Sequence, residues 1–218
     1  MNKFSVIMTV YDSAQELEDN LPAFLTQEYE QGGYEVIVVD ESSTDNTGDV
    51  LKRLRSDYPH LYSTFLPRPN RLVSRKKMAF SIGAKAAKHE WLLLTSISKK
   101  PAASDVLQAI SSTLDESADV TLGYIGRKGI RLQPFATLDD VRRHIVRSER
   151  ILTSVRERKC LHYAWGRYDF IIVRKALIYD LLRLYEQRTS ALAMPGLWLS
   201  IVGHNLLGRS STTLLQTT

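Results

Sequence analysis

The chain has 218 residues, of which 44% are hydrophobic and 24% are charged, a composition typical of a globular protein with a packed core. This composition excludes disordered and collagen-like chains. The single cysteine, Cys160, excludes an internal disulfide framework and a cysteine-based zinc cluster, and it favours a reducing compartment, so we expect a cytoplasmic protein. The sequence has no run of about 20 apolar residues of the kind that spans a membrane.

Charge is distributed unevenly along the chain. The formal net charge is +5, but residues 1–50 hold one base and eleven acids, whereas the remaining residues hold 28 bases and 13 acids. A strongly basic remainder predicts attraction for an anion, which could be a nucleotide, a nucleic acid or a lipid headgroup. Composition alone does not choose among these three.

Short β-branched runs alternate with helical patterns over the first 124 residues. Ser13 and Glu16 form a capping-box pattern for the first helix. Strands are expected at residues 4–10, 34–40, 61–67, 91–95 and 118–124, and helices after Ser13, around Val50, at 75–88 and from Val106. This alternation predicts an α/β fold with a mainly parallel twisted sheet flanked by helices, and ligands bind such sheets at the carboxyl ends of the strands.

The second half is less regular but shows no linker, so we expect a single domain in which both halves share one sheet. Residues 138–159 form a basic amphipathic helical pattern, followed by a short strand, FIIV, and a helix over about 175–186. The basic helix has two interpretations. It either contacts an anionic membrane surface or is a core helix whose arginines face water, and the second is favoured because any globular helix needs a polar face.

Polar residues follow three of the expected strands. Tyr11 and Asp12 follow the first, Asp40 ends the second, and Thr95 ends the fourth. An aromatic ring can stack on a base and a carboxylate can accept hydrogen bonds from a base or ribose, so this pattern indicates a nucleotide pocket. Asp40 is favoured as functional, whereas for residues 42–45 helix capping is the favoured alternative.

Two segments resemble family 2 glycosyltransferases of the GT-A fold: FSVIMTVYDSAQELEDNLPAFLTQEYEQGGYEVIVVDESSTDNT and RKKMAFSIGAKAAKHEWLLLTSISKKP. The resemblance implies one GT-A-like domain over residues 1–218, with a nucleotide-binding half at 1–100 and an acceptor half at 101–218. It also implies transfer of a sugar, with inversion, from a nucleotide-diphosphate sugar to an acceptor hydroxyl, as in polysaccharide biosynthesis.

The resemblance carries site residues over to this chain. A UDP-sugar is the favoured donor, and the acceptor is a saccharide or a lipid-linked molecule, which would place the protein in the cytoplasm or at the inner face of the membrane. For the cluster of basic residues at 71–77, the alternative to contact with the diphosphate is that the side chains are simply exposed to solvent. The implied contacts to base and ribose are Thr9, Tyr11 and Asp40 with Ser43 nearby, and Arg71 or Lys77 would lie toward the diphosphate.

The chain departs from the family pattern at two places. The Asp-x-Asp metal loop is replaced by Ser96, Ile97 and Ser98, and neutral hydroxyls are poor ligands for Mg²⁺ or Mn²⁺, so we expect no metal there. Beyond Glu186 no acid is left to act as the general base, and the weak candidates for that role are Asp169 and His204.

These departures leave two functions open, an active glycosyltransferase or a catalytically impaired pseudo-glycosyltransferase that acts as a nucleotide-binding or interaction module. Lys99 and Lys100 follow the altered loop and could neutralise a diphosphate in place of a metal, although a solvated loop is the favoured alternative. Nucleic acid is not expected as a partner, because the chain lacks an aromatic binding platform and a recognisable binding module.

Overall fold

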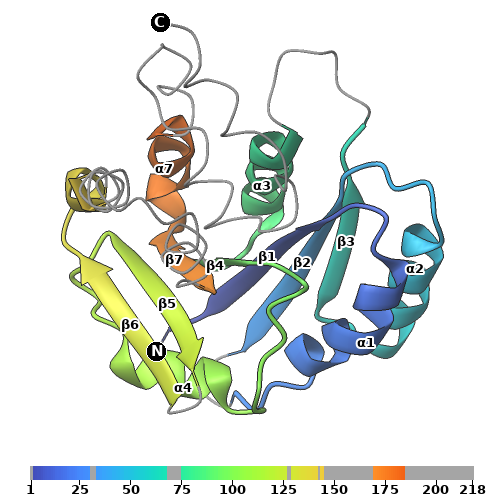
Figure 1. The fold of residues 1–218 in the computed structure, drawn as a ribbon, viewed down its shortest axis with the longest axis horizontal. Helices are drawn as coiled ribbons and strands as arrows, with labels where there is room; N and C mark the ends of the chain where they lie inside the picture. The colour runs from blue at the N-terminus through green and yellow to red at the C-terminus, as the bar shows by residue number, and fades with distance from the viewer. Residues whose placement is uncertain are drawn as a thin grey trace, which may run out of the picture.

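In the computed structural model the described residues are 2–29, 33–67, 75–126, 129–141, 143–144 and 169–184. They form one seven-stranded sheet in the order β3-β2-β1-β4-β7-β5-β6, with helices on both faces (Figure 1). The elements are β1 (Phe4–Val10), α1 (Ala14–Leu25), β2 (Tyr34–Asp40), α2 (Thr47–Asp57), β3 (Leu61–Phe65), α3 (Arg75–Ala86), β4 (Trp91–Thr95), α4 (Val106–Thr113), β5 (Val120–Gly126), β6 (Gly129–Phe135), β7 (Phe170–Arg174), a 3₁₀ turn at Lys175–Leu177, and α7 (Ile178–Leu184).

The α/β fold predicted from the alternating pattern is confirmed. β1 pairs in parallel with β2 and β4, and β2 pairs in parallel with β3. β7 is antiparallel to both β4 and β5, so β5 runs in the same direction as the first four strands. β6, antiparallel to β5, is a strand that the sequence pattern did not predict. It is partly exposed along its length, so it lacks the continuous apolar run that marks the buried strands.

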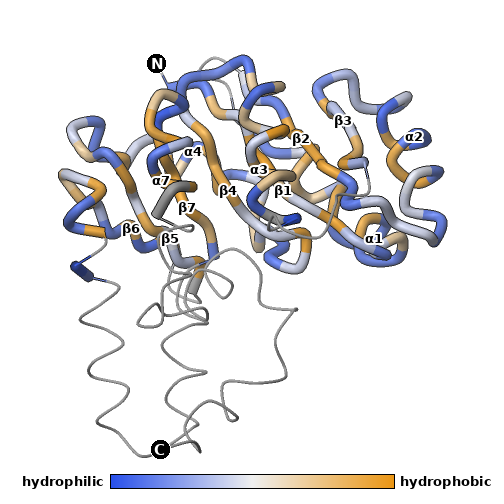
Figure 2. Tube along the Cα trace, turned by 90° about the horizontal axis from the view of Figure 1, so that it is seen from above, coloured by the Kyte–Doolittle hydropathy of each residue, from blue (hydrophilic) through white to orange (hydrophobic). Residues whose placement is uncertain are grey.

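The sheet is covered on both faces by apolar side chains. On one face, Phe4, Val6 and Met8 of β1 pack in a cluster with residues of α1, α2 and α4. On the other face, Ile7 packs in a second cluster with residues of α3 and α7. Figure 2 shows apolar residues gathered along central strands such as β4 and β7. These two cores hold the strand ends, and the loops that follow them, in fixed positions.

The start of α1 differs from the sequence prediction. Ser13 precedes the helix as expected, but it makes no side-chain capping bond, so the predicted capping box is wrong. Its hydroxyl donates to the Tyr11 carbonyl instead, and Asp45 Oδ2 accepts from the Ala14 amide at 3.1 Å. A carboxylate 31 residues away therefore caps α1, which local spacing could not indicate.

The second half is described in part. The predicted strand FIIV is β7, and the helix predicted after it begins as a 3₁₀ turn and continues as α7. Of the basic helix predicted at 138–159, residues 138–141 and 143–144 are helical, and the remainder lies outside the described residues. No helix in the described ranges is both long enough and apolar enough to cross a membrane.

Candidate functional site

The carboxyl ends of β1, β2 and β4 meet at one edge of the sheet. Val10 at the end of β1 is in register with Asp40 at the end of β2, and Thr95 at the end of β4 is in register with Met8. Along the chain, β2 lies beside β1 and β3 lies beside β2, whereas β4 lies on the opposite side of β1. Strand order therefore reverses between β1 and β4, which is where open α/β sheets bind ligands.

Asp40 and Ser43 form the centre of a hydrogen-bond network at this edge. Oδ1 of Asp40 accepts from the Ser43 amide at 2.9 Å and from the Ser43 hydroxyl at 2.6 Å. The Ser43 hydroxyl also accepts from the Asp12 amide at 2.9 Å, which ties the end of β2 to the end of β1. Among the described residues Oδ2 of Asp40 has no partner, so it can accept a hydrogen bond from a ligand.

Two left-handed residues shape the loops beside this network. Asp12 has φ 46° and Ser42 has φ 63°, and they are the only described non-glycine residues with positive φ. Residues held in this sparsely populated region cluster at ligand sites. Asp12 Oδ1 accepts from the Thr44 amide at 2.7 Å, and the Ser42 hydroxyl donates to the Leu66 carbonyl. The two turns therefore hold each other in place.

Residues 42–45, for which capping was the favoured alternative, include a capping residue in Asp45. Its Oδ1 accepts from the Thr47 amide at the start of α2, and its Oδ2 accepts from the Ala14 amide at the start of α1. Burial alone would raise the pKa of Asp45, but hydrogen bonds from Thr47 and Ala14 outweigh it and lower that pKa. Asp45 therefore joins the two helix starts that flank the network.

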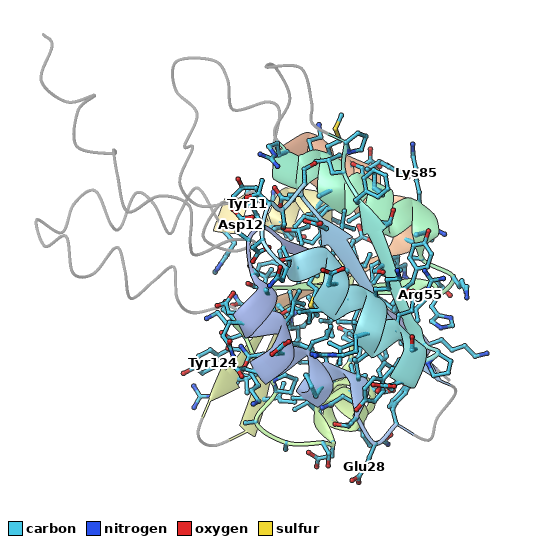
Figure 3. The ribbon with its side chains drawn as sticks, turned by 90° about the vertical axis from the view of Figure 1, so that its right-hand side faces the viewer. Tyr11, Asp12, Glu28, Arg55, Lys85 and Tyr124 are labelled. Atoms are coloured by element: carbon cyan, nitrogen blue, oxygen red, sulfur yellow. The ribbon has the colours of Figure 1, made fainter. Side chains whose placement is uncertain are left out.

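Tyr11 lies at the end of β1 with its ring half exposed, next to Asp12 (Figure 3). The guanidinium of Arg75, the first residue of α3, lies 5.1 Å from the centre of the Tyr11 ring. Nε of Arg75 is buried and has no hydrogen-bond partner among the described residues. The site thus combines an aromatic ring, a cation and an acceptor carboxylate.

Of the other residues that the resemblance assigned to the donor, some lie close to this site and one lies outside the described residues. Thr9 is buried on β1, two residues before Tyr11, and Lys77 is partly buried on α3, two residues after Arg75. Arg71 lies outside the described residues. Arg75 and Asp12 were not among the assigned residues. Asp12 directly follows Tyr11, and Arg75 lies within the basic cluster at 71–77, so the sequence position of each residue already indicated that it could belong to the site.

The loop after β4 does not fit a divalent cation. Ser96 and Ser98 place their hydroxyl oxygens 3.0 Å apart, and the next side chain, Lys99, is itself a cation. Mg²⁺ and Mn²⁺ take anionic oxygen ligands. Across the described ranges no cluster of three or more histidine, cysteine or acidic residues is placed to hold a metal. The residues described at this loop therefore supply no carboxylate for the metal that the family implies.

Asp169, one of the two candidate bases, immediately precedes β7 at the same edge of the sheet. Its Oδ1 lies 2.8 Å from Nζ of Lys99, and its Oδ2 accepts from the Ile125 amide at 2.8 Å. Both carboxylate oxygens are therefore engaged. His204, the other candidate, lies outside the described residues.

Comparisons with known proteins agree with this architecture. The model of glycosyl transferase family 2 matches residues 5–95, which run from β1 through the end of β4. A poly(ribitol-phosphate) beta-glucosyltransferase of Bacillus spizizenii is 25% identical over 134 residues, and the match covers 59% of this chain. Glycosyltransferase AglE of Haloferax volcanii is 37% identical over 57 residues, or 26% of this chain. Each match covers 19% of the relative, so this chain spans only a small part of their length.

A solved structure shows the same fold over most of the chain. S. aureus TarS residues 1–349, in complex with UDP, superimposes with a TM-score of 0.53 at 22% identity, covering 87% of this chain and 52% of that 1–349 chain. At that identity the likeness establishes the fold. Residues 5–95 therefore resemble glycosyl transferase family 2, and the chain has the GT-A fold seen in TarS 1–349.

Proposed function

We propose that this protein binds a nucleotide-diphosphate sugar at the carboxyl ends of β1 and β2 and transfers the sugar, with inversion, to an acceptor hydroxyl. The observation that carries the proposal is the Asp40 carboxylate. Its Oδ1 is fixed by two hydrogen bonds from Ser43, and its Oδ2 is left available at the point where strand order reverses. A fixed acceptor of this kind suits the N–H of a base or the hydroxyl of a ribose.

The surrounding residues take complementary roles in this proposal. The exposed ring of Tyr11 stacks on the base, and Thr9 and Ser43 support the contacts to base and ribose. Arg75 and Lys77 on α3, together with Arg71, neutralise the diphosphate, which leaves as the bond from the sugar to phosphate breaks. The overall positive charge of the chain after residue 50 favours the approach of such an anion.

The donor is proposed to be a UDP-sugar and the acceptor a saccharide or lipid-linked hydroxyl. The TarS complex with UDP and the relative that acts on poly(ribitol phosphate) support these choices by analogy. During transfer the acceptor oxygen bonds to the anomeric carbon, the bond to the diphosphate breaks, and the acceptor proton passes to a general base. Asp169 and His204 stay the candidates for this base.

Calorimetric titration of UDP and of GDP into the wild-type protein tests the proposal. We expect UDP to bind and Asp40→Ala to weaken that binding by about tenfold or more, since a hydrogen bond to a charged group is lost. Asp57→Ala is the matched control, because Asp57 is exposed at the far end of α2. Equal affinity in wild type and Asp40→Ala, or no binding of either nucleotide, would contradict the proposed donor site.

A second candidate, a nucleotide-binding module without turnover, is favoured by the replacement of the acidic metal ligands with Ser96 and Ser98. UDP release from UDP-sugars, measured with and without a saccharide acceptor, separates the two functions. Binding without release at any acceptor tested would favour the module.

Peripheral membrane contact through residues 138–159 is also part of the proposal. It rests on the basic amphipathic pattern of this segment and on the lipid-linked acceptors expected from the resemblance. Flotation with anionic and neutral vesicles tests it, and equal flotation with both would argue against contact through the arginines.

A further inference from the structure

Lys99 occupies an unusual place for a lysine in a surface loop. It lies one residue beyond Ser98, yet its side chain is only 26% exposed. Together with Val6, Phe24, Leu93, Ile125 and Phe170 it lines a cavity beneath the loop. Most of this side chain is therefore removed from water, and the cavity beside it is lined largely by apolar residues. A cation in such a place needs a partner, because burying an unpaired charge is costly.

Asp169 is that partner, and it connects several elements. Its carboxylate is 10% exposed, with Oδ1 2.8 Å from Nζ of Lys99 and Oδ2 accepting from the Ile125 amide on β5. Its own amide donates to the Gly123 carbonyl at 2.7 Å, and its carbonyl accepts from the Thr95 hydroxyl at 3.0 Å. Lys99 is thus tied to the point where β4, β5 and β7 meet.

The loop that carries Lys99 is itself folded into a turn. The Lys99 amide donates to the Ser96 carbonyl at 2.9 Å, which folds residues 96–99 into a turn. This turn follows the carboxyl end of β4, on one side of the point where strand order reverses, and Tyr11 and Asp12 follow β1 on the other. Fixing the position of Lys99 therefore also fixes the turn at residues 96–99, which lies on one side of the proposed donor site.

We propose that the Lys99–Asp169 ion pair positions the loop after β4 without a divalent cation, so that this site binds its nucleotide diphosphate independently of metal. The inference rests on the proposed donor site. A metal ion positions such a loop by attracting carboxylates on it, and here the charges are reversed: the loop carries the cation and the sheet carries the carboxylate. Because the pair is largely buried, its attraction is screened far less by water and salt than that of an exposed pair.

This role differs from direct contact between the Lys99 ammonium and a phosphate, and the two can be separated. If Lys99 only positions the loop, Lys99→Met and Asp169→Asn both weaken UDP binding. If Lys99 contacts the phosphate, Asp169→Asn releases the ammonium from its partner and strengthens UDP binding, whereas Lys99→Met weakens it. Whether Asp169→Asn weakens or strengthens UDP binding therefore distinguishes the positioning role from direct contact with the phosphate.

The experiment is calorimetric titration of UDP into five proteins, in EDTA and in Mn²⁺. These are wild type, Lys99→Met, Asp169→Asn, the double variant and Lys85→Met, whose site on the exposed surface of α3 makes it the matched control (Figure 3). We expect equal wild-type affinity in EDTA and Mn²⁺, about tenfold weaker binding in each single variant, no greater loss in the double variant, and no change in Lys85→Met.

Hydrogen exchange of the unliganded proteins supplies a second readout that does not depend on the nucleotide. We expect the amides of residues 96–100 to exchange faster in Lys99→Met than in wild type or Lys85→Met, with global stability followed by thermal unfolding in parallel. Faster exchange confined to this loop supports the positioning role even if Lys99→Met is less stable overall.

Three results would overturn the inference. One is a requirement of wild-type protein for Mn²⁺ in UDP binding. Another is tighter UDP binding by Asp169→Asn, and the third is unchanged loop exchange in Lys99→Met. If wild-type protein binds no nucleotide in either buffer, the proposed donor site and the metal-independent binding built on it both fail. The exchange data then decide only whether the ion pair positions the loop.

Discussion

At the scale of single residues, the candidate site is held together by short polar side chains that bridge two turns. Ser43 connects Asp40 with Asp12, and Asp45 connects the starts of α1 and α2. Two of these contacts, from the Asp12 amide to Ser43 and from the Ala14 amide to Asp45, join residues 31 positions apart. The amides of Asp12, Ala14 and Thr47 each gain an acceptor that they would otherwise lack. The same residues that shape the site therefore contribute to stability.

Asp45→Ala is expected to lower the free energy of unfolding by about 1 kcal/mol near neutral pH, because the Ala14 and Thr47 amides lose their acceptor. The pKa of Asp45 is lowered in the folded protein, so its contribution is present above its ordinary pKa and is lost as pH falls through the folded value.

Urea unfolding of wild type and Asp45→Ala at pH 6 and at pH 3 measures this effect. The difference in free energy between the two proteins is expected to shrink at pH 3. Asp57→Ala, at the exposed end of α2, serves as the control. A difference as large at pH 3 as at pH 6 would show that the ionised carboxylate is not responsible.

At the scale of elements, β7 joins the two parts of the sheet. It pairs with β4 on one side and with β5 on the other, and all of its residues from Phe170 to Val173 are buried. Gly123 on β5 faces Phe170 in this pairing, and a Cβ at Gly123 would overlap the Phe170 ring. Glycine is required here for space rather than for backbone conformation.

Gly123→Ala is expected to destabilise the protein by about 1–3 kcal/mol, because the Phe170 ring must move within a filled core. Gly48→Ala is the control, since a Cβ there meets nothing within 4 Å and alanine favours the helix α2. Thermal or urea unfolding of the two variants measures the contrast. Equal stability of Gly123→Ala and wild type would indicate that the β5–β7 pair adjusts without cost.

At the scale of the whole molecule, the order of the strands in the sheet differs from their order along the chain. β7 is the last strand described along the chain, but it lies inside the sheet between β4 and β5. A chain that ends before β7 would leave β4 and β5 without a partner on their facing edges, exposing apolar surface and unpaired amides. The described elements are therefore expected to unfold together, consistent with the single domain expected over residues 1–218.

Two truncated chains test this dependence. A chain of residues 1–184 keeps β7 and α7, whereas a chain of residues 1–168 lacks both. We expect the shorter chain to lose cooperative unfolding, seen by circular dichroism and by the fluorescence of its tryptophans, including Trp91 on β4, while the longer chain keeps it. The same unfolding midpoint for both chains would show that residues 1–168 fold without β7.

The amino-acid sequence by itself determined the α/β class, the bounds of β1, β2 and β4, and the placement of Tyr11 and Asp40 at strand ends. Buried parallel strands are continuous apolar runs, and the polar residues that end them stand out locally. Only the tertiary structure decided which residues meet across those ends. The cap of α1 by Asp45, the contact of Arg75 with Tyr11 and the pairing of Lys99 with Asp169 join residues 31, 64 and 70 positions apart. Such contacts depend on strand order and on the packing of α3 and β7 against the sheet, and no local pattern of the chain encodes them.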